Sequence, residues 1–245
     1  MKKIVVSLKN SDRRVNFDKL FAGLGHEYFE AIVPENNDPR FEQFIAKSLY
    51  GRELRKGEVG CTLSHFEIIK KFCQVNDGSE WLLVMEDDAL PEKHFHKFMS
   101  SFHTSIGIHD NIPKVILLGH SKTSKKNIFI QRLTQPLAKK TVVNGFAFGQ
   151  NKNVSFCGTV CYLINKQAAY IISECKVPYW MADDWTLFCK LGVSVLHPFV
   201  PLVYEDLSYA SSTGNVVFQQ HDFFKRPKTT LKEIIIGQCK FYNNY

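Results

Sequence analysis

Residues 81–91 have the sequence WLLVMEDDALP, in which five apolar residues run directly into three carboxylates. A continuous apolar run of this length is typical of a β-strand buried on both faces of a parallel sheet. The three acids come where that strand ends, although neighbouring carboxylates repel one another and lose hydration near a sheet edge. In open α/β sheets, ligands bind outside the carboxyl ends of the strands. The stretch therefore predicts an α/β sheet whose acidic residues bind a metal or a substrate at one edge, with a solvated acidic turn before Pro91 as the alternative.

Strands and helices alternate on both sides of this stretch. Residues 58–74 have the strongest helical periodicity, with apolar residues on two neighbouring stripes of the helix. Other strands are expected at 4–8, 28–33, 115–118, 160–164 and 193–200, and other helices at 13–24, 166–175 and 185–191. Such alternation favours an open α/β sheet with flanking helices. We expect one domain over residues 1–215 and a basic, aromatic C-terminal segment over 216–245.

The composition is that of an ordinary globular chain. Of the 245 residues, 44% are hydrophobic and 22% are charged, and no apolar run approaches the ~20 residues of a membrane-spanning helix. The seven cysteines are scattered and odd in number, which favours reduced thiols. Cys157 and Cys161 could form half of a zinc site, but no second Cys/His pair with structural-zinc spacing follows. The N-terminal apolar stretch is too short for a signal peptide, so we expect a cytoplasmic protein.

Positive charge is concentrated in two parts of the chain. The net charge is +7, and residues 111–173 contain nine Lys and Arg residues but no Asp or Glu. Such a block attracts phosphate-bearing partners, or is simply a solvated loop. No nucleic-acid motif accompanies it, so no nucleic-acid partner is expected. The segment 221–245 mixes lysines with apolar residues, which predicts peripheral contact with an anionic membrane or a terminal helix docked on the domain by its isoleucines.

A second acidic pair, Asp183-Asp184, precedes the helix expected at 185–191. Aspartate is a preferred N-cap, so one of the two is expected to cap this helix. The neighbouring Trp180 and Trp185 offer aromatic faces on which a sugar ring could stack, and carboxylates can accept protons from hydroxyl groups. The pair is thus a candidate for either a helix start or a sugar site.

The chain resembles glycosyltransferase family 25, the lipooligosaccharide-biosynthesis group that also includes the collagen galactosyltransferases. The most specific match is Gly57-Glu58-Val59-Gly60-Cys61-Thr62-Leu63-Ser64-His65. The other matching pieces, in the family's order, are Val5-Val6-Ser7-Leu8 with Arg13-Arg14, Leu83-Val84-Met85-Glu86-Asp87-Asp88-Ala89, Gly158-Thr159-Val160-Cys161-Tyr162-Leu163-Ile164 and Ala182-Asp183-Asp184. They cover residues 4 to about 200, and the C-terminal residues match no part of the family pattern.

This resemblance implies a GT-A-like fold, a Rossmann-like nucleotide-sugar-binding sheet with a D-x-D-type metal motif. Glu86 and Asp88 take the first and third positions of that motif and would hold Mn²⁺ or Mg²⁺. The family commonly transfers galactose from UDP-galactose with inversion. The expected partners are therefore a UDP-sugar, most simply UDP-galactose, and a lipooligosaccharide, other glycolipid or oligosaccharide acceptor.

Roles follow for single residues. The expected metal ligands are Glu86, Asp88 and a late histidine, taken as His221 with His197 as the alternative. The expected donor-binding residues are Arg13, Arg14, Ser64, His65 and Asp87. Ser64 is expected to be more accessible than His65, which could equally be a structural residue. Asp184 or Asp183 would be the general base, because inversion needs one base on the face opposite the leaving diphosphate.

Two other classes of protein would share some of these features. A metal-dependent phosphodiesterase also needs clustered acids, but usually with several His and Asp ligands at metal-binding spacing, which the chain lacks. A non-catalytic basic module that binds glycans or phosphate would explain the charge but not the acids after a buried strand.

Overall fold

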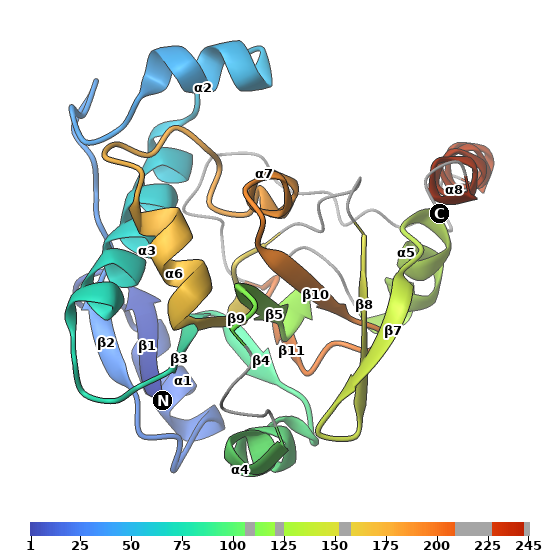
Figure 1. Ribbon diagram of the computed structural model, residues 1–245, viewed down its shortest axis with the longest axis horizontal. Helices are drawn as coiled ribbons and strands as arrows, with labels where there is room; N and C mark the ends of the chain where they lie inside the picture. Colours follow the sequence, from blue (N-terminus) through green and yellow to red (C-terminus); the bar gives the residue numbers. More distant parts are fainter. Residues whose placement is uncertain (106–110, 121–124, 152–157, 209–226, 243–245) are drawn as a thin grey trace.

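A computed structural model describes residues 1–105, 111–120, 125–151, 158–208 and 227–242. The fold is a large open sheet with helices on both faces and a small second sheet (Figure 1). In spatial order the large sheet consists of β2 Glu27–Glu30, β1 Lys2–Ser7, β3 Trp81–Glu86, β9 Cys161–Asn165, β5 Lys114–Leu117, β10 Ser194–Pro198, β8 Phe146–Gln150 and β7 Ala138–Val143. The small sheet consists of β4 Ala89–Pro91, β11 Val203–Glu205 and β6 Gly119–His120.

The predicted α/β class, with an open sheet and flanking helices, is confirmed. The sheet is mixed, however, and not parallel throughout. β1 pairs in parallel with β2 and β3, and β10 pairs in parallel with β5. Between these two groups, β9 runs antiparallel to both β3 and β5. A continuous apolar run indicates that a strand is buried on both faces, but it does not indicate the direction of the strand. The expectation that the central strands are all parallel was therefore wrong.

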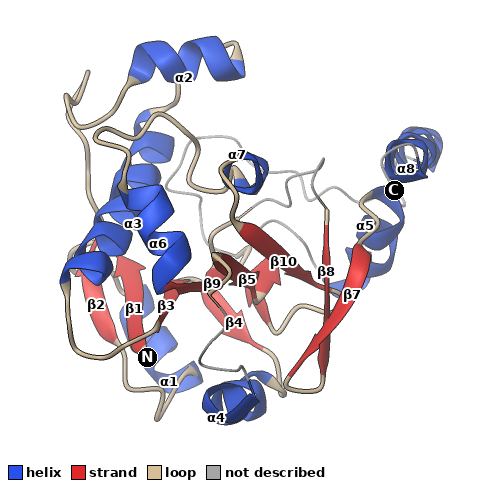
Figure 2. Cartoon of the chain, in the orientation of Figure 1, coloured by secondary structure: helices blue, strands red, loops and turns tan. Residues whose placement is uncertain are grey.

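Helices cover both faces of the large sheet (Figure 2). They are α1 Arg13–Leu20, α2 Gln43–Tyr50, α3 Lys56–Gln74, α4 Phe95–Ser105, α5 Ile128–Thr134, α6 Lys166–Ser173, α7 Trp185–Lys190 and α8 Pro227–Tyr242, with a 3₁₀ turn at Lys125–Asn127. The expected helix at 13–24 ends at Leu20, because Gly23 and Gly25 have φ of 78° and 65° and turn the chain. Helices α2, α4 and α5 were not predicted.

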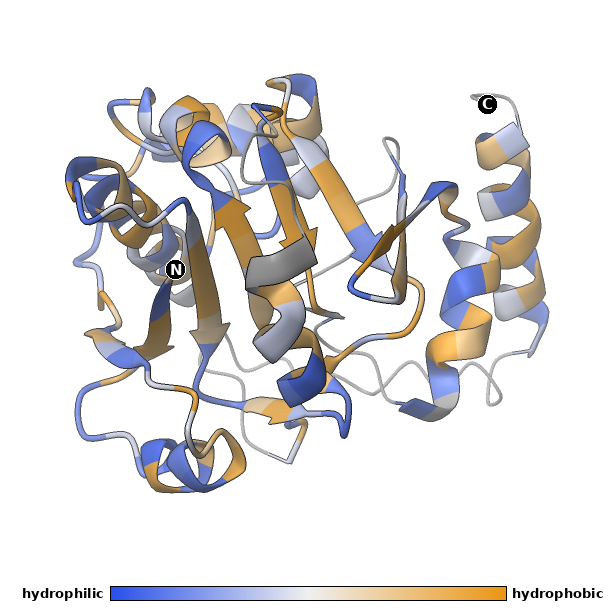
Figure 3. Cartoon of the chain, turned by 60° about the horizontal axis from the view of Figure 1, so that its bottom comes forward, coloured by the Kyte–Doolittle hydropathy of each residue, from blue (hydrophilic) through white to orange (hydrophobic). Residues whose placement is uncertain are grey.

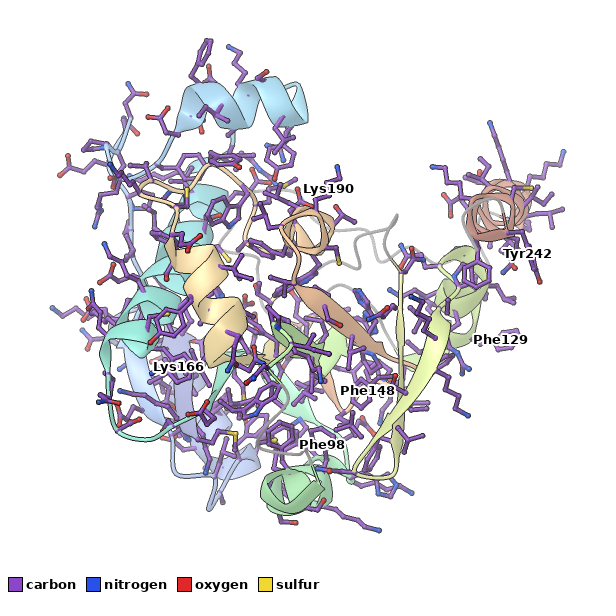
Figure 4. All side chains as sticks on the ribbon, viewed as in Figure 1. Phe98, Phe129, Phe148, Lys166, Lys190 and Tyr242 are labelled. Atoms are coloured by element: carbon purple, nitrogen blue, oxygen red, sulfur yellow. The ribbon has the colours of Figure 1, made fainter. Side chains whose placement is uncertain are left out.

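The core lies in two layers, one on each face of the sheet. In β3, Leu82 and Val84 face α3, α6 and α7, while Leu83 and Met85 face α1 and α4. All four side chains are fully buried, which is the alternation expected of a central strand. On the α4 side the core is rich in aromatic rings, such as Phe98 and Phe148, whose centroids are 6.0 Å apart (Figure 4).

A close contact fixes α3 against the segment that follows β2. Gly60 lies so near this segment that an added Cβ would be 2.6 Å from the Ile32 carbonyl oxygen. Ser64, one turn further along α3, accepts a hydrogen bond of 2.8 Å from the Ile32 amide and donates one of 2.7 Å to the Gly60 carbonyl. Ser64 is fully buried, so the prediction that it is the more accessible residue was wrong.

We expect Gly60→Ala to lower the free energy of unfolding by at least about 2 kcal/mol, because backbone must move to admit the methyl group. Inside a helix the same change would otherwise stabilise by up to about 1 kcal/mol through helix propensity. Chemical denaturation of both proteins measures the difference. A variant as stable as the parent, or more stable, would contradict the close contact.

The C-terminal helix α8 packs against α5 at one end of the molecule (Figure 1). The Gln238 amide donates a hydrogen bond of 2.8 Å to the Leu133 carbonyl, and an added Cβ at Gly237 would collide with the Thr134 carbonyl. The helix is therefore docked, which was one of the two alternatives expected. Of its isoleucines, Ile234 is half-buried, whereas Ile235 and Ile236 are exposed. Within the described ranges, no helix has the length and apolar character needed to cross a membrane.

Candidate active site

Strands β1, β3, β4 and β11 bring the acidic stretch to one edge of the fold. Glu86 is the last residue of β3 and pairs with Val6 of β1. The Glu86 amide donates to the Val160 carbonyl, and the Asp87 amide donates to the Val6 carbonyl. The chain then enters β4, where Ala89 pairs with Glu205 at the end of β11. The three consecutive carboxylates and Glu205 consequently lie where the two sheets meet, as expected for the carboxyl end of a strand in an open sheet.

Asp87 ties the first loop of the chain to this edge. Its Oδ2 accepts hydrogen bonds of 2.7 Å and 2.8 Å from the hydroxyls of Ser7 and Ser11. Its Oδ1 lies 3.5 Å from the Arg13 guanidinium, which also lies 3.2 Å from Asp88 Oδ2. Both oxygens of Asp87 are thus used in positioning neighbouring side chains.

Arg14 binds the first loop of the chain and is linked to the acids through Ser7. Its Nε donates to the Ser7 hydroxyl at 2.9 Å, and its guanidinium also donates to the Leu8 carbonyl at 3.0 Å. The guanidinium carbon lies 4.6 Å from the centroid of the Tyr28 ring. The structure therefore separates two arginines that the sequence left equivalent: Arg13 contacts the acidic edge and Arg14 supports the fold.

Asp88 has a strongly perturbed carboxyl group. Its Oδ1 is buried and has no hydrogen-bond partner among the described residues. Burial, together with the negative charges of Glu86 and Glu205, raises the pKa of Asp88 well above its ordinary value. A buried, unpaired carboxylate oxygen beside two further acids fits a divalent cation, since hard cations take carboxylate oxygens and remove the repulsion.

Glu86 turns toward α3 and the start of β9. Its Oε1 accepts a hydrogen bond from the Thr159 hydroxyl and lies 3.4 Å from His65 Nε2. His65 is 3% exposed, and its Nδ1 lies 2.9 Å from the Tyr162 hydroxyl. The Nδ1 atom of His65 is thus held by Tyr162, while its Nε2 atom faces Glu86.

The second acidic pair is split by its hydrogen bonds. Asp184 caps α7 through the amide of Leu187 at 3.1 Å, and its other oxygen accepts from the Tyr50 hydroxyl at 2.8 Å. The expected capping role is confirmed for this residue. Asp183 instead accepts a hydrogen bond of 2.8 Å from the Gly158 amide. Asp184 is therefore tied to α7 and α2, whereas Asp183 is directed to the segment that precedes β9.

The two acidic groups converge on one dipeptide. Gly158 donates its amide to Asp183, and Thr159, the next residue, donates its hydroxyl to Glu86. Asp183 and Glu86 are therefore linked through Gly158-Thr159, although they are far apart in the sequence. The aspartate pair predicted to supply the general base and the predicted metal motif therefore lie at the same edge of the fold.

The two tryptophans predicted to bind a sugar and the two histidines considered as metal ligands lie elsewhere in the chain. Trp180 and Trp185 are 3% and 2% exposed and belong to the core beneath α7, so the predicted stacking of a sugar on their faces was wrong. His221 lies outside the described residues. His197 is buried on β10 with its ring stacked on His120, the centroids 6.5 Å apart. Burial lowers the pKa of His197, which stays neutral.

Sequence reasoning missed Glu205 and the role of Thr159. Glu205 ends the short apolar run Leu202-Val203-Tyr204, so it repeats on a smaller scale the pattern of acids after a buried strand. This pattern could have identified Glu205 from the sequence. Thr159 carries no such signal, because a lone threonine before an apolar run is common in strands.

Comparison with known proteins identifies a family. The profile of glycosyltransferase family 25 (LPS biosynthesis protein) matches residues 1–187. A "Glycosyltransferase 25 family member" from Aedes aegypti is 36% identical over 90 residues, which are 34% of this chain and 14% of that relative. The match thus spans a small part of the relative's length.

Solved structures that resemble the chain have lower sequence identity to it than this relative has. One is a glycosyltransferase involved in the glycosylation of the major capsid of PBCV-1, with a TM-score of 0.40, 11% identity, and coverage of 84% of this chain and 94% of that one. Another is the galactosyltransferase LgtC in complex with donor and acceptor sugar analogs, with a TM-score of 0.34, 10% identity, and coverage of 80% and 73%. Both TM-scores lie below 0.5, so no residue role is carried over from these structures. The profile match over residues 1–187 shows that the chain belongs to glycosyltransferase family 25.

Proposed function

We propose that the chain is an inverting glycosyltransferase that moves a sugar, galactose from UDP-galactose, to a lipooligosaccharide or related glycan. The observation that carries this proposal is the convergence of Asp88, Glu86 and Asp183 on one edge of the sheet, the last two joined through Gly158-Thr159. This arrangement offers carboxylates for a cation and, separately, a carboxylate for proton transfer. Membership of the family supports the reaction class and a nucleotide-sugar donor.

Asp88 and Glu86 are the residues proposed to hold Mn²⁺ or Mg²⁺. The unpartnered Oδ1 of Asp88 and the like charge of Glu86 fit this role, because a cation removes the cost that both acids carry in the folded chain. When bound, the ion would neutralise the charge that develops on the diphosphate leaving group. Arg13, whose guanidinium lies beside Asp88, is the residue proposed to contact the donor phosphates.

Asp183 is the general base favoured by the geometry. A base must lie where the acceptor hydroxyl meets the donor, and Asp184 is held instead by the α7 cap and by Tyr50. Asp183 is linked to Glu86 through Gly158-Thr159, and this is the edge at which the donor would bind. Its carboxylate would also stabilise positive charge on an oxocarbenium-like transition state.

A thermal-shift screen with nucleotide sugars tests the donor. We expect UDP-galactose with Mn²⁺ to raise the melting temperature, because a ligand at 100 times its dissociation constant stabilises the folded state by about 2.7 kcal/mol. ADP-, GDP- and CMP-sugars serve as matched controls. No shift with any nucleotide sugar, combined with hydrolysis of a simple phosphodiester, would instead identify a phosphodiesterase.

We also propose that the outer face of α8 contacts an anionic membrane. Leu231, Ile235 and Tyr242 are 59%, 54% and 75% exposed and lie on one side of the helix by their spacing. Lys228 and Lys232 are exposed and, by the same spacing, lie along one border of this face. Apolar and polar residues alternate along this helix, as Figure 3 shows. An apolar face bordered by lysines suits the surface of an anionic bilayer, where a lipid-linked acceptor would be found.

We expect the double variant Leu231→Glu with Ile235→Glu to lose binding to vesicles that contain phosphatidylserine, measured by sedimentation. Binding of the parent should weaken as salt is raised, since each basic residue near the surface contributes about 1 kcal/mol. Phe44→Glu is the matched control, because Phe44 on α2 is 83% exposed on another part of the molecule. Equal sedimentation of parent and double variant would rule out the α8 face.

A further inference from the structure

A cysteine, a histidine and a glutamate form a compact cluster beside the acidic edge. Cys61 and His65 are one helical turn apart on α3, so their side chains lie on the same face of the helix. Both face Glu86 at the end of β3. Within the part of the chain that the structure describes, this is the one group of three such side chains whose ligand atoms all lie within 4.8 Å of one another.

The separations of these atoms are close to those around a tetrahedral zinc ion. With Zn–N and Zn–O distances of about 2.0–2.1 Å and a Zn–S distance of about 2.3 Å, neighbouring N and O ligands lie about 3.4 Å apart and S and O ligands about 3.6 Å apart. His65 Nε2 and Glu86 Oε1 are 3.4 Å apart, and Cys61 Sγ and Glu86 Oε1 are 4.0 Å apart. Cys61 Sγ and His65 Nε2 lie within 4.8 Å of one another, so the Cys61 side chain would move inward when the ion binds.

His65 is oriented as a metal ligand would be. A ligating histidine commonly has its second ring nitrogen fixed by a hydrogen-bonding group, and His65 Nδ1 lies 2.9 Å from the Tyr162 hydroxyl. The side chain of His65 is 4% exposed, yet its Nε2 is buried and has no hydrogen-bond partner among the described residues. An unsatisfied buried nitrogen is costly, and a cation would remove that cost. Glu86 is likewise held, by the Thr159 hydroxyl.

We infer that Cys61, His65 and Glu86 form a binding site for a borderline-soft divalent cation, Zn²⁺ or Co²⁺. Thiolate and imidazole ligands select such ions, whereas the oxygens of Asp88 suit Mn²⁺ or Mg²⁺. Binding would form one bond to each of the three residues and release the thiol proton of Cys61 to solvent. The Glu86 side chain is 25% exposed, which leaves a side on which water can complete the tetrahedron. Glu86 would then serve both cation sites, but the inference does not depend on sugar transfer.

Titration with Co²⁺ in the absence of any donor tests this site. We expect visible absorption bands of tetrahedral cobalt and a thiolate-to-cobalt charge-transfer band in the near ultraviolet, both displaced by Zn²⁺. Cys61→Ser should abolish the charge-transfer band, and His65→Gln should weaken cobalt binding by at least about 10-fold. Cys73→Ser, on the same helix but outside the cluster, is the matched control and should leave the spectrum unchanged.

Asp88→Asn separates this site from the proposed donor site. It should retain the cobalt spectrum even where it loses all transfer, so failure of one proposal does not imply failure of the other. A spectrum that survives Cys61→Ser, or no tetrahedral spectrum at all, would overturn the inference.

Alkylation of the unaltered protein gives a second test that does not rely on a variant folding. Zn²⁺ should protect Cys61 from iodoacetamide, as measured by mass spectrometry of peptides. Cys239, which is exposed on α8, is the internal reference and should react at the same rate with and without Zn²⁺. Equal reactivity of Cys61 in both conditions would also overturn the inference.

Discussion

Replacing Asp88 by Asn is expected to lower turnover with a nucleotide-sugar donor by at least about 10³-fold, which corresponds to about 4 kcal/mol of lost transition-state stabilisation. The substitution keeps the size of the side chain and removes the charge that would bind the cation. In the folded chain Oδ1 of this side chain is buried and has no hydrogen-bond partner among the described residues, so no structural contact depends on that oxygen.

The same substitution should stabilise the metal-free protein at neutral pH. Burial and the charges of Glu86 and Glu205 outweigh the nearby Arg13 guanidinium and raise the pKa of Asp88, so its ionised form is disfavoured in the folded chain. As pH rises above the ordinary value of about 3.9, the unfolded chain loses this proton first, and the folded protein loses stability up to the raised pKa. We therefore expect Asp88→Asn to melt at a higher temperature than the parent at pH 7, with the difference vanishing near about pH 3.

Asp18→Asn is the control for both measurements, because Asp18 is an acid on α1 that bonds Tyr28 and His26 and lies outside the acidic edge. A variant of Asp88 that turns over normally would contradict its assignment to the cation. A variant that melts below the parent at neutral pH would contradict the account of its burial.

Asp183→Asn is expected to lower kcat by at least about 10²-fold with donor binding retained, at the low end of general-base effects. The asparagine can still accept the hydrogen bond from the Gly158 amide, so the loop should keep its place. Asp184→Asn should act differently. It keeps the cap of α7, because asparagine is as good an N-cap as aspartate, but it loses an oxygen that accepts from Tyr50, which costs about 1 kcal/mol of stability, with a smaller effect on kcat.

Steady-state kinetics and thermal melting of the two variants together give the answer. A large loss of kcat in Asp184→Asn with normal stability, and none in Asp183→Asn, would reverse the assignment. Normal kcat in both variants would place the base elsewhere. Asp77→Asn is the control, because Asp77 is an exposed acid on the turn before β3 that accepts a hydrogen bond from the Ser79 amide.

Much of the fold could be predicted because buried strands and helices have recognisable patterns of apolar residues in the sequence. The strands expected at 81–85, 115–118 and 160–164 all appear in the central sheet, and the helix expected at 58–74 is α3. Strand direction could not be predicted, since β9 is as apolar as β3 but runs antiparallel to it. Helix α4 was missed because its aromatic residues follow the acidic stretch and were not recognised as a helical face.

The candidate site was predicted in part. The acids after β3 were found because charge after an apolar run is a strong local signal. Their partners came from elsewhere in the chain: Thr159, Glu205 and the link from Gly158 to Asp183 depend on which strands pair. The distinction between the two arginines of α1, and between the two acids before α7, depends on single hydrogen bonds that spacing alone does not encode.

The most direct test of the central claim is turnover of UDP-galactose by the purified protein with a glycan acceptor, measured in EDTA and again after Mn²⁺ is added. We expect no transfer in EDTA and recovery with Mn²⁺, because the carboxylates of Asp88 and Glu86 would otherwise repel the donor diphosphate. Full turnover in EDTA would contradict the proposal that these acids hold a cation needed for transfer.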